Sequence, residues 1–274
     1  MVNSQAKRVV LTIAGSDPGG GAGIQADLKT FAALGVYGYS AITQVIAQNS
    51  STVRDIEGVS PRLIARQVEL LARERRPNEI KVGALGSAAA VRSVVRVIEN
   101  LRLAAPVVDP VIVSSAGVRL LDRAGEAALV KYLIPRARVI TPNISEAQAL
   151  TGIRIINEER MRAAAQRLVL MGARAVVIKG GHRGGTESSD LMFDGHHLVW
   201  LRAPRIAGPA AHGTGCAFSA AIAAYLARGV ELEGAVREAK RYVTAALRRS
   251  FRYGRGRPLL EHFVAPRKRG SRIP

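Results

Sequence analysis

The chain has 274 residues, 48% of them hydrophobic, and carries 40 Lys and Arg against 21 Asp and Glu, a formal net charge of +19. This length suits one large domain or two small ones, and the hydrophobic content excludes disorder caused by low hydrophobicity. No apolar run reaches the ~20 residues of a membrane-spanning helix, and the single Cys216 excludes an intrachain disulfide and a cysteine zinc cluster. We therefore expect a cytoplasmic protein.

The positive charge is concentrated near the C-terminus. Residues 237–274 hold twelve Lys and Arg against Glu238 and Glu261. Proteins that bind nucleic acid usually combine such a basic stretch with aromatic side chains or a recognition helix, and aromatic residues make up only 4% of this chain. We therefore do not expect nucleic acid to be a partner, and we expect residues 264–274 to form a mobile basic tail.

Short β-branched runs alternate with amphipathic segments along the chain. The patterns predict strands at 9–14, 39–47, 80–82, 107–108, 139–140 and 175–178, and helices at 24–34, 61–75, 88–100, 123–134 and 158–171. Ser60 is the expected cap of the second helix, which starts with Pro61. A hairpin around 194–195 and two long helices between 214 and 249 follow. This alternation predicts one α/β domain with a mainly parallel sheet covered on both faces.

Ligands of such sheets bind beyond the carboxyl ends of the strands, and a glycine-rich loop, Gly15–Gly23, follows the first strand. The loop lacks the Gly-Lys-Ser/Thr ending of a P-loop and the spacing of a dinucleotide fingerprint. Its glycines would let a ligand approach the backbone, although a purely structural turn is nearly as good an interpretation. Asp27 lies in the first turns of the next helix, and we expect this acidic side chain near the mouth of a possible pocket. Its position favours the ligand-binding interpretation of the loop.

A second candidate site is the run Ala211-His212-Gly213-Thr214-Gly215-Cys216, which leads into an apolar helix. Unpaired N–H groups at a helix start, together with the helix dipole, form a site for an anion. The same dipole should lower the pKa of the Cys216 thiol, which could then act as a base or nucleophile. The alternative is a small buried cysteine beside a tight turn. We interpret His212 as structural.

A third candidate set is acidic. Asp109 follows the strand at 107–108, and Asn143 and Glu146 follow the strand at 139–140. Carboxylate oxygens at strand ends suit Mg²⁺, although Asn143 could simply cap the helix that carries Glu146. Lys179 ends another strand and would add a cation at the same edge. An anion site, magnesium ligands and a base are the combination that phosphoryl transfer requires.

Seven blocks of the chain carry a family resemblance: Ile13–Pro18, Gly20–Thr30, Ala47–Asn49, Val108–Val111, Thr141–Asn143 with Glu146, Lys179–His182 and His212–Cys216. With these blocks in this order the chain resembles the hydroxymethylpyrimidine/phosphomethylpyrimidine kinases of thiamine biosynthesis, in the ribokinase-like superfamily. The resemblance spans about residues 8–263. It implies a three-layer α/β/α fold with a mainly parallel central sheet and a single kinase domain over residues 1–263.

The resemblance also implies the activity, which is ATP-dependent phosphorylation of 4-amino-5-hydroxymethyl-2-methylpyrimidine and then of its monophosphate. At the pyrimidine end, the position matching Gln48 binds the aminopyrimidine, and those matching Gly15, Asp27 and Ala84 line the pocket. A side-chain amide suits this role, because it can donate to a ring nitrogen and accept from the exocyclic amine.

At the phosphate end, the resemblance implies an anion hole formed by Gly213, Thr214 and Gly215, with Cys216 as the base. Asp109 and Glu146 would serve Mg²⁺, and Asn143, Lys179 and Thr214 would lie near the phosphates of ATP. We expect a homodimer whose ligands are the pyrimidine, ATP and Mg²⁺.

Four departures from the usual family pattern leave alternatives open. Ala84 stands where a Met is usual, Ser115 where a Lys is usual, Ala210-Ala211 belong to a replaced Asn-Thr stretch, and Gln44 replaces a small apolar residue. A smaller side chain at 84 would enlarge the pocket, and loss of the Lys would remove a charge. Whether both phosphorylations occur stays open, as do two alternatives: a pyridoxal/pyridoxine kinase and a pyrimidine-binding protein with weakened catalysis.

Overall fold

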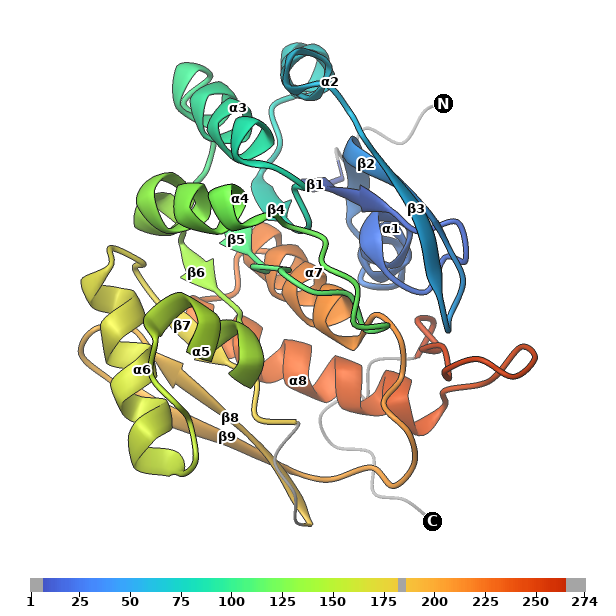
Figure 1. Cartoon of the computed structure of the whole chain (residues 1–274), viewed down its shortest axis with the longest axis vertical. Helices are drawn as coiled ribbons and strands as arrows, with labels where there is room; N and C mark the ends of the chain where they lie inside the picture. The colour runs from blue at the N-terminus through green and yellow to red at the C-terminus, as the bar shows by residue number, and fades with distance from the viewer. Residues whose placement is uncertain (1–6, 182–185, 265–274) are drawn as a thin grey trace.

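The computed structural model describes residues 7–181 and 186–264, and the strands in these ranges form one nine-stranded sheet (Figure 1). The strand order is β3-β2-β1-β4-β5-β6-β7-β8-β9, in which neighbouring strands from β2 to β7 are parallel and β3, β8 and β9 are antiparallel to their neighbours. The strands are β1 (Val9–Ser16), β2 (Tyr37–Gln48), β3 (Val53–Gly58), β4 (Glu79–Val82), β5 (Val107–Val108), β6 (Val139–Ile140), β7 (Val176–Ile178), β8 (Glu187–Phe193) and β9 (Leu198–Pro204).

Helices cover both faces of this sheet, which gives the three-layer α/β/α arrangement that the sequence predicted (Figure 1). They are α1 (Gly23–Ala33), α2 (Pro61–Glu74), α3 (Ala88–Asn100), α4 (Arg123–Ala128), η1 (Leu129–Leu133), η2 (Ile134–Arg136), α5 (Ile144–Thr151), α6 (Glu158–Leu170), α7 (Thr214–Ala227) and α8 (Leu232–Arg248). Ser60 caps α2 by accepting a hydrogen bond from the backbone N–H of Leu63, as expected.

The two-residue period of the buried strands builds a core on each face. Val107 and Val139 pack in the layer of α1, α7 and α8, whereas the next residues, Val108 and Ile140, pack in the layer of α2 to α6. Because both faces are covered, these strands are apolar throughout rather than alternating. The carboxyl ends of β1, β4, β5, β6 and β7 consequently meet at one edge of a rigid sheet.

Three details differ from the expectations. The edge strand β3 was not predicted, because its exposed, charged sequence shows no apolar alternation. The helix predicted at 123–134 ends as a π-helical turn and a 3₁₀ turn, where Pro135 supplies no backbone N–H to continue the ladder. Val264, predicted to begin the mobile tail, is buried in the layer of α7 and α8; residues 265–274 lie outside the described residues.

Within the described ranges, no helix combines the length and apolar character needed to cross a bilayer.

Candidate active site

A cleft of about 880 Å³ opens at the carboxyl edge of the parallel strands. The loops after these strands and the first turn of α7 form its walls, which is where a sheet of this type binds ligands. It brings together all but one of the predicted site residues: Gly15, Gln48, Ala84, Asp109, Asn143, Glu146, Lys179, Gly213, Thr214, Gly215 and Cys216.

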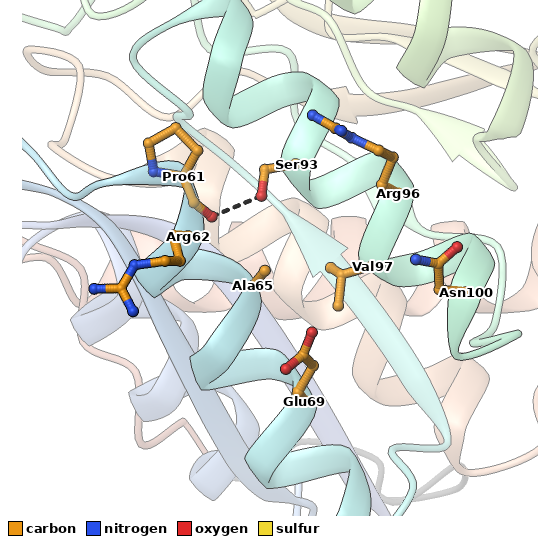
Figure 2. A pocket seen from close by; sticks show the side chains of 8 residues that line it. All are labelled: Pro61, Arg62, Ala65, Glu69, Ser93, Arg96, Val97 and Asn100. Atoms are coloured by element: carbon orange, nitrogen blue, oxygen red, sulfur yellow. Dashed lines mark hydrogen bonds between the residues drawn. The ribbon is translucent and has the colours of Figure 1, made fainter.

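A second, smaller hollow of about 290 Å³ lies on the surface between α2 and α3 (Figure 2). Figure 2 shows the side chains of Arg62, Glu69 and Arg96 around it, and the Ser93 hydroxyl donates to the carbonyl oxygen of Pro61 (2.7 Å). None of the predicted site residues lines this hollow. The strand-end cleft is therefore the candidate active site.

The first turn of α7 begins at a glycine, as the predicted anion site requires. Gly213 caps the helix with φ +80°, and no side chain caps the first N–H groups, which are left without intrahelical acceptors. A Cβ at Gly213 would lie 1.7 Å from the carbonyl oxygen of Gly21, so the two glycine turns touch through their backbones. This contact and the positive φ both require glycine at 213.

Lys179 lies next to this turn and forms a salt bridge with Asp109. Its Nζ is 2.7 Å from Asp109 Oδ1, and a Cβ built on Gly215 would lie 3.0 Å from the same Nζ. The predicted cation at this sheet edge is confirmed. Both members of the pair line the cleft, and the Lys179 ammonium lies beside the N–H groups of the turn.

Glu146 and Asn143 form a capping box at the start of α5. The Asn143 side chain accepts from the backbone N–H of Glu146 (2.9 Å), and the Glu146 carboxylate accepts from the backbone N–H of Asn143 (2.8 Å). The interpretation of Asn143 as a helix cap is thus confirmed. Asn143 also lines the cleft. Burial raises the pKa of the Glu146 carboxyl to about 7; Lys179 opposes the rise and Asp109 adds to it.

The donor set at this end of the cleft fits Mg²⁺. Asp109 and Glu146 both supply carboxylate oxygens, and the charge of Asp109 makes ionisation of Glu146 less favourable. A divalent cation between them would offset that repulsion. Among the described residues, no group of three or more His, Cys, Asp or Glu side chains is arranged to hold a metal, so Mg²⁺ here would keep several water ligands.

Asp27 does not line the cleft, which corrects the prediction that it lies at the mouth of the pocket. Its side chain is completely buried beneath the cleft, where Oδ2 accepts from Lys81 Nζ (2.8 Å) and from the Thr12 hydroxyl (2.6 Å). The reason is helical phase: Asp27 faces the sheet within α1, so it meets the strands β1 and β4 instead of the solvent.

The pKa of Cys216 also differs from the expectation. Burial raises the pKa of its thiol to about 11; the Lys81 ammonium opposes this rise, whereas the Asp27 and Asp109 carboxylates add to it. The prediction considered the helix dipole and left out the loss of hydration, which is the largest cause of the shift. The free protein therefore holds a protonated thiol at neutral pH.

Another part of the cleft wall is apolar. Ala84 packs with Ile46 and Leu120, and Gln48, which is half-buried, lines the wall beside them. The Gln48 side chain interacts with the Asp17 carboxyl and helps to lower the pKa of that group. The Gln48 amide therefore lies at the edge of a small apolar pocket. A flat heteroaromatic ring in this pocket would pack against the apolar side chains and could hydrogen-bond the amide.

Two charged residues of this site were not predicted from the sequence. Lys81 was taken as part of a buried strand and Asp17 as part of a loop; His212, interpreted as structural, also lines the cleft. The only signal for Lys81 was a lysine between Ile80 and Val82, in a strand that is otherwise apolar. Its partner could not be inferred without knowing that β4 lies beside β1.

Comparison with known proteins gives three concordant findings. The family model described as phosphomethylpyrimidine kinase matches residues 17–260. The hydroxymethylpyrimidine/phosphomethylpyrimidine kinase of Haemophilus influenzae is 44% identical over 94% of this chain and 97% of its own length. The thiamine biosynthesis bifunctional protein ThiED of Geobacter sulfurreducens is 46% identical over 93% of this chain, which spans only 52% of that protein.

A solved structure is similar over the same region. The pyridoxal kinase of Staphylococcus aureus, in complex with AMP-PCP and pyridoxal, has a TM-score of 0.87 and 35% sequence identity, covering 94% of both chains. That structure holds AMP-PCP, an ATP analogue, together with pyridoxal.

Proposed function

Because the chain belongs to the hydroxymethylpyrimidine/phosphomethylpyrimidine kinase family, we propose that it transfers the γ-phosphoryl group of ATP to the hydroxymethyl oxygen of 4-amino-5-hydroxymethyl-2-methylpyrimidine, and then to the resulting monophosphate. One observation carries the proposal: a single cleft holds both a glycine turn with free N–H groups beside Lys179 and a small apolar pocket edged by Gln48.

The phosphate end supports in-line transfer. The N–H groups of Thr214, Gly215 and Cys216 and the Lys179 ammonium would stabilise the negative charge of the transferred group. Asp109 and Glu146 would hold Mg²⁺, which when bound would neutralise phosphate charge at this end of the cleft. Asp109 and Lys179 follow β5 and β7, Glu146 lies in the first turn of α5, and the N–H groups belong to α7, so the fold fixes their relative positions.

Cys216 is the proposed proton acceptor. Only the thiolate can take the hydroxyl proton, and with a pKa of about 11 the thiolate is a fraction of about 10⁻⁴ at neutral pH. Lys81 is the cation that favours this thiolate. The base role therefore predicts activity that rises with pH.

The pyrimidine end supports recognition of an aminopyrimidine. The Gln48 amide can accept from an exocyclic amine and donate to a ring nitrogen. Ala84, Ile46 and Leu120 would pack against the ring. We also propose a cytoplasmic homodimer with one kinase domain over residues 1–263, and sedimentation equilibrium tests the dimer.

The decisive experiment is mass-spectrometric detection of mono- and diphosphate products after incubation of the pyrimidine alcohol with Mg–ATP. Both products support the full proposal, and the monophosphate alone restricts it to the first step. Binding of the pyrimidine measured by calorimetry, without any phosphorylated product, would overturn the proposal in favour of a pyrimidine-binding protein.

A second candidate function is pyridoxal phosphorylation. It is favoured by the likeness to the Staphylococcus aureus pyridoxal kinase and by the small side chain of Ala84, which leaves space in the apolar pocket. The ratio of kcat/KM for the pyrimidine and for pyridoxal separates the two candidates. A higher value for pyridoxal would make pyridoxal the substrate.

A further inference from the structure

Three side chains without a role in the proposed mechanism form a continuous hydrogen-bonded chain in the wall of the cleft. Ser115 Oγ lies 2.8 Å from His212 Nδ1, and His212 Nε2 lies 3.0 Å from Asp17 Oδ2. All three residues line the cleft. They come from distant parts of the sequence, so only the fold brings them together.

The hydrogen bonds of Asp17 determine the direction of this chain. Its carboxylate accepts from the backbone N–H groups of Gly19, Gly21 and Ala22. Despite burial, which raises it, the pKa of the Asp17 carboxyl is lowered to about 2 by its hydrogen bonds, chiefly the one with His212. An ionised carboxylate only accepts, so Nε2 of His212 carries the hydrogen. In the neutral ring Nδ1 is then an acceptor, and the Ser115 hydroxyl donates to it.

A serine hydroxyl that donates to an imidazole, itself oriented by a buried carboxylate, is an activated nucleophile. His212 is only 6% exposed, whereas Ser115 is exposed to the solvent of the cleft. The base is thus shielded, and the nucleophile is accessible.

The position of Ser115 places this nucleophile at the phosphate end. His212 directly precedes Gly213, the first residue of the anion turn. Ser115 lies in the short turn between Val113 and Arg119, which pair as an antiparallel bridge. Within this turn the Ser114 backbone N–H donates to the carbonyl of Val118 (2.7 Å). The hairpin at 113–119 and the hydrogen bond to His212 therefore hold the Ser115 hydroxyl beside the anion turn at the start of α7.

We propose that Ser115 is a phosphoryl acceptor, modified by a nucleoside triphosphate whose γ-phosphoryl group occupies the anion turn when no alcohol is bound. The inference rests on the proposed function for the position of that group. Ser115 Oγ forms a bond to the γ-phosphorus, and the bond from this phosphorus to the β–γ bridging oxygen breaks. The products are phosphoserine and a nucleoside diphosphate, and the hydroxyl proton passes to His212 Nδ1, where Asp17 stabilises the imidazolium.

The test uses the full chain incubated with Mg–ATP in the absence of any alcohol. Intact-mass and peptide mass spectrometry should find one phosphoryl group per chain, located on Ser115. Ser115→Ala should abolish the modification. Ser114→Ala is the matched control and should retain it, because Ser114 lies on the same hairpin but its hydroxyl accepts from the Val118 backbone N–H instead of contacting His212. His212→Gln should slow the modification about 100-fold, the lower range of a general-base effect.

The outcomes separate this inference from the proposed function. Phosphorylation of the pyrimidine or pyridoxal alcohol without phosphoserine at 115 would overturn the inference and leave the kinase assignment in place. A phosphoryl group at another residue, or one retained in Ser115→Ala, would also overturn it. Phosphoserine at 115 that is lost in Ser115→Ala and slowed in His212→Gln, with both variants retaining the wild-type circular dichroism spectrum, would support it even if neither alcohol were turned over.

Discussion

Two lysine–aspartate pairs lie in and beside the cleft of this protein, and they differ in solvent exposure. Lys81–Asp27 and Lys179–Asp109 have nearly the same length, 2.8 and 2.7 Å. In the first pair neither side chain has any exposed surface, whereas in the second the Lys179 side chain is 16% exposed toward the cleft. The same type of ion pair is therefore inaccessible to solvent in the first case and partly accessible in the second.

The difference separates a structural role from a ligand-binding role. A completely buried pair cannot exchange its partner for a ligand, and losing either member leaves an uncompensated charge in the interior. An accessible pair can release its lysine to a phosphate oxygen, because water and ligand reach it. Cys216 interacts with both pairs: Lys81 lowers the pKa of its thiol, and Asp27 and Asp109 raise it.

Lys81→Met should give the largest effect. Removing the ammonium leaves Asp27 ionisable in a site without solvent, so the free energy of unfolding should fall by about 3–5 kcal/mol. Urea denaturation followed by circular dichroism measures it. The matched control is Lys179→Met, which should lose less stability because Lys179 is partly exposed to the cleft and Asp109 lines it. Equal losses in the two variants would contradict the distinction between the pairs.

Lys179→Met should instead damage turnover. Removing a cation that faces the transferred phosphoryl group should lower kcat about 10²–10³-fold, the usual cost of losing such a donor. Initial rates of ADP formation at saturating pyrimidine and ATP give kcat. An unchanged kcat would show that Lys179 binds no reacting group.

Cys216→Ala should lower kcat by about 100-fold, since the proton acceptor is lost. In the wild-type protein, kcat should rise about tenfold per pH unit through the neutral range, because the thiolate fraction grows until the pH reaches the pKa of about 11. The residual rate of Cys216→Ala should lack this slope. A flat wild-type profile would reject the thiolate as the base.

Ala84→Met should give the smallest effect, because Ala84 lies in the apolar pocket and belongs to neither charged pair. The larger side chain should reduce kcat/KM for pyridoxal relative to the pyrimidine about tenfold, the range expected for a steric change in an apolar pocket. Competition between the two alcohols in one reaction measures the ratio directly. No change in the ratio would show that residue 84 does not contact the ring.

The sequence was sufficient where the signal is local. The strands at 107–108 and 139–140 and the glycine turn before Cys216 were predicted because β-branched runs and a Gly-Thr-Gly sequence at a helix start indicate structure by themselves. The Lys81–Asp27 pair was not predicted, because it depends on β1 lying beside β4. The raised pKa of Cys216 has the same origin: desolvation depends on what the fold places around the thiol.

The backbone contact between Gly21 and Gly213 has a consequence for protein engineering. Because the space for a side chain at 213 is occupied by the carbonyl of Gly21, the two loops are complementary surfaces, each shaped by the other. In a chimaera that receives one of these loops from a homologue with a different backbone course, the two loops would clash where their backbones now touch. The glycine-rich loop after β1 and the turn before α7 are therefore one module, to be transplanted together or not at all.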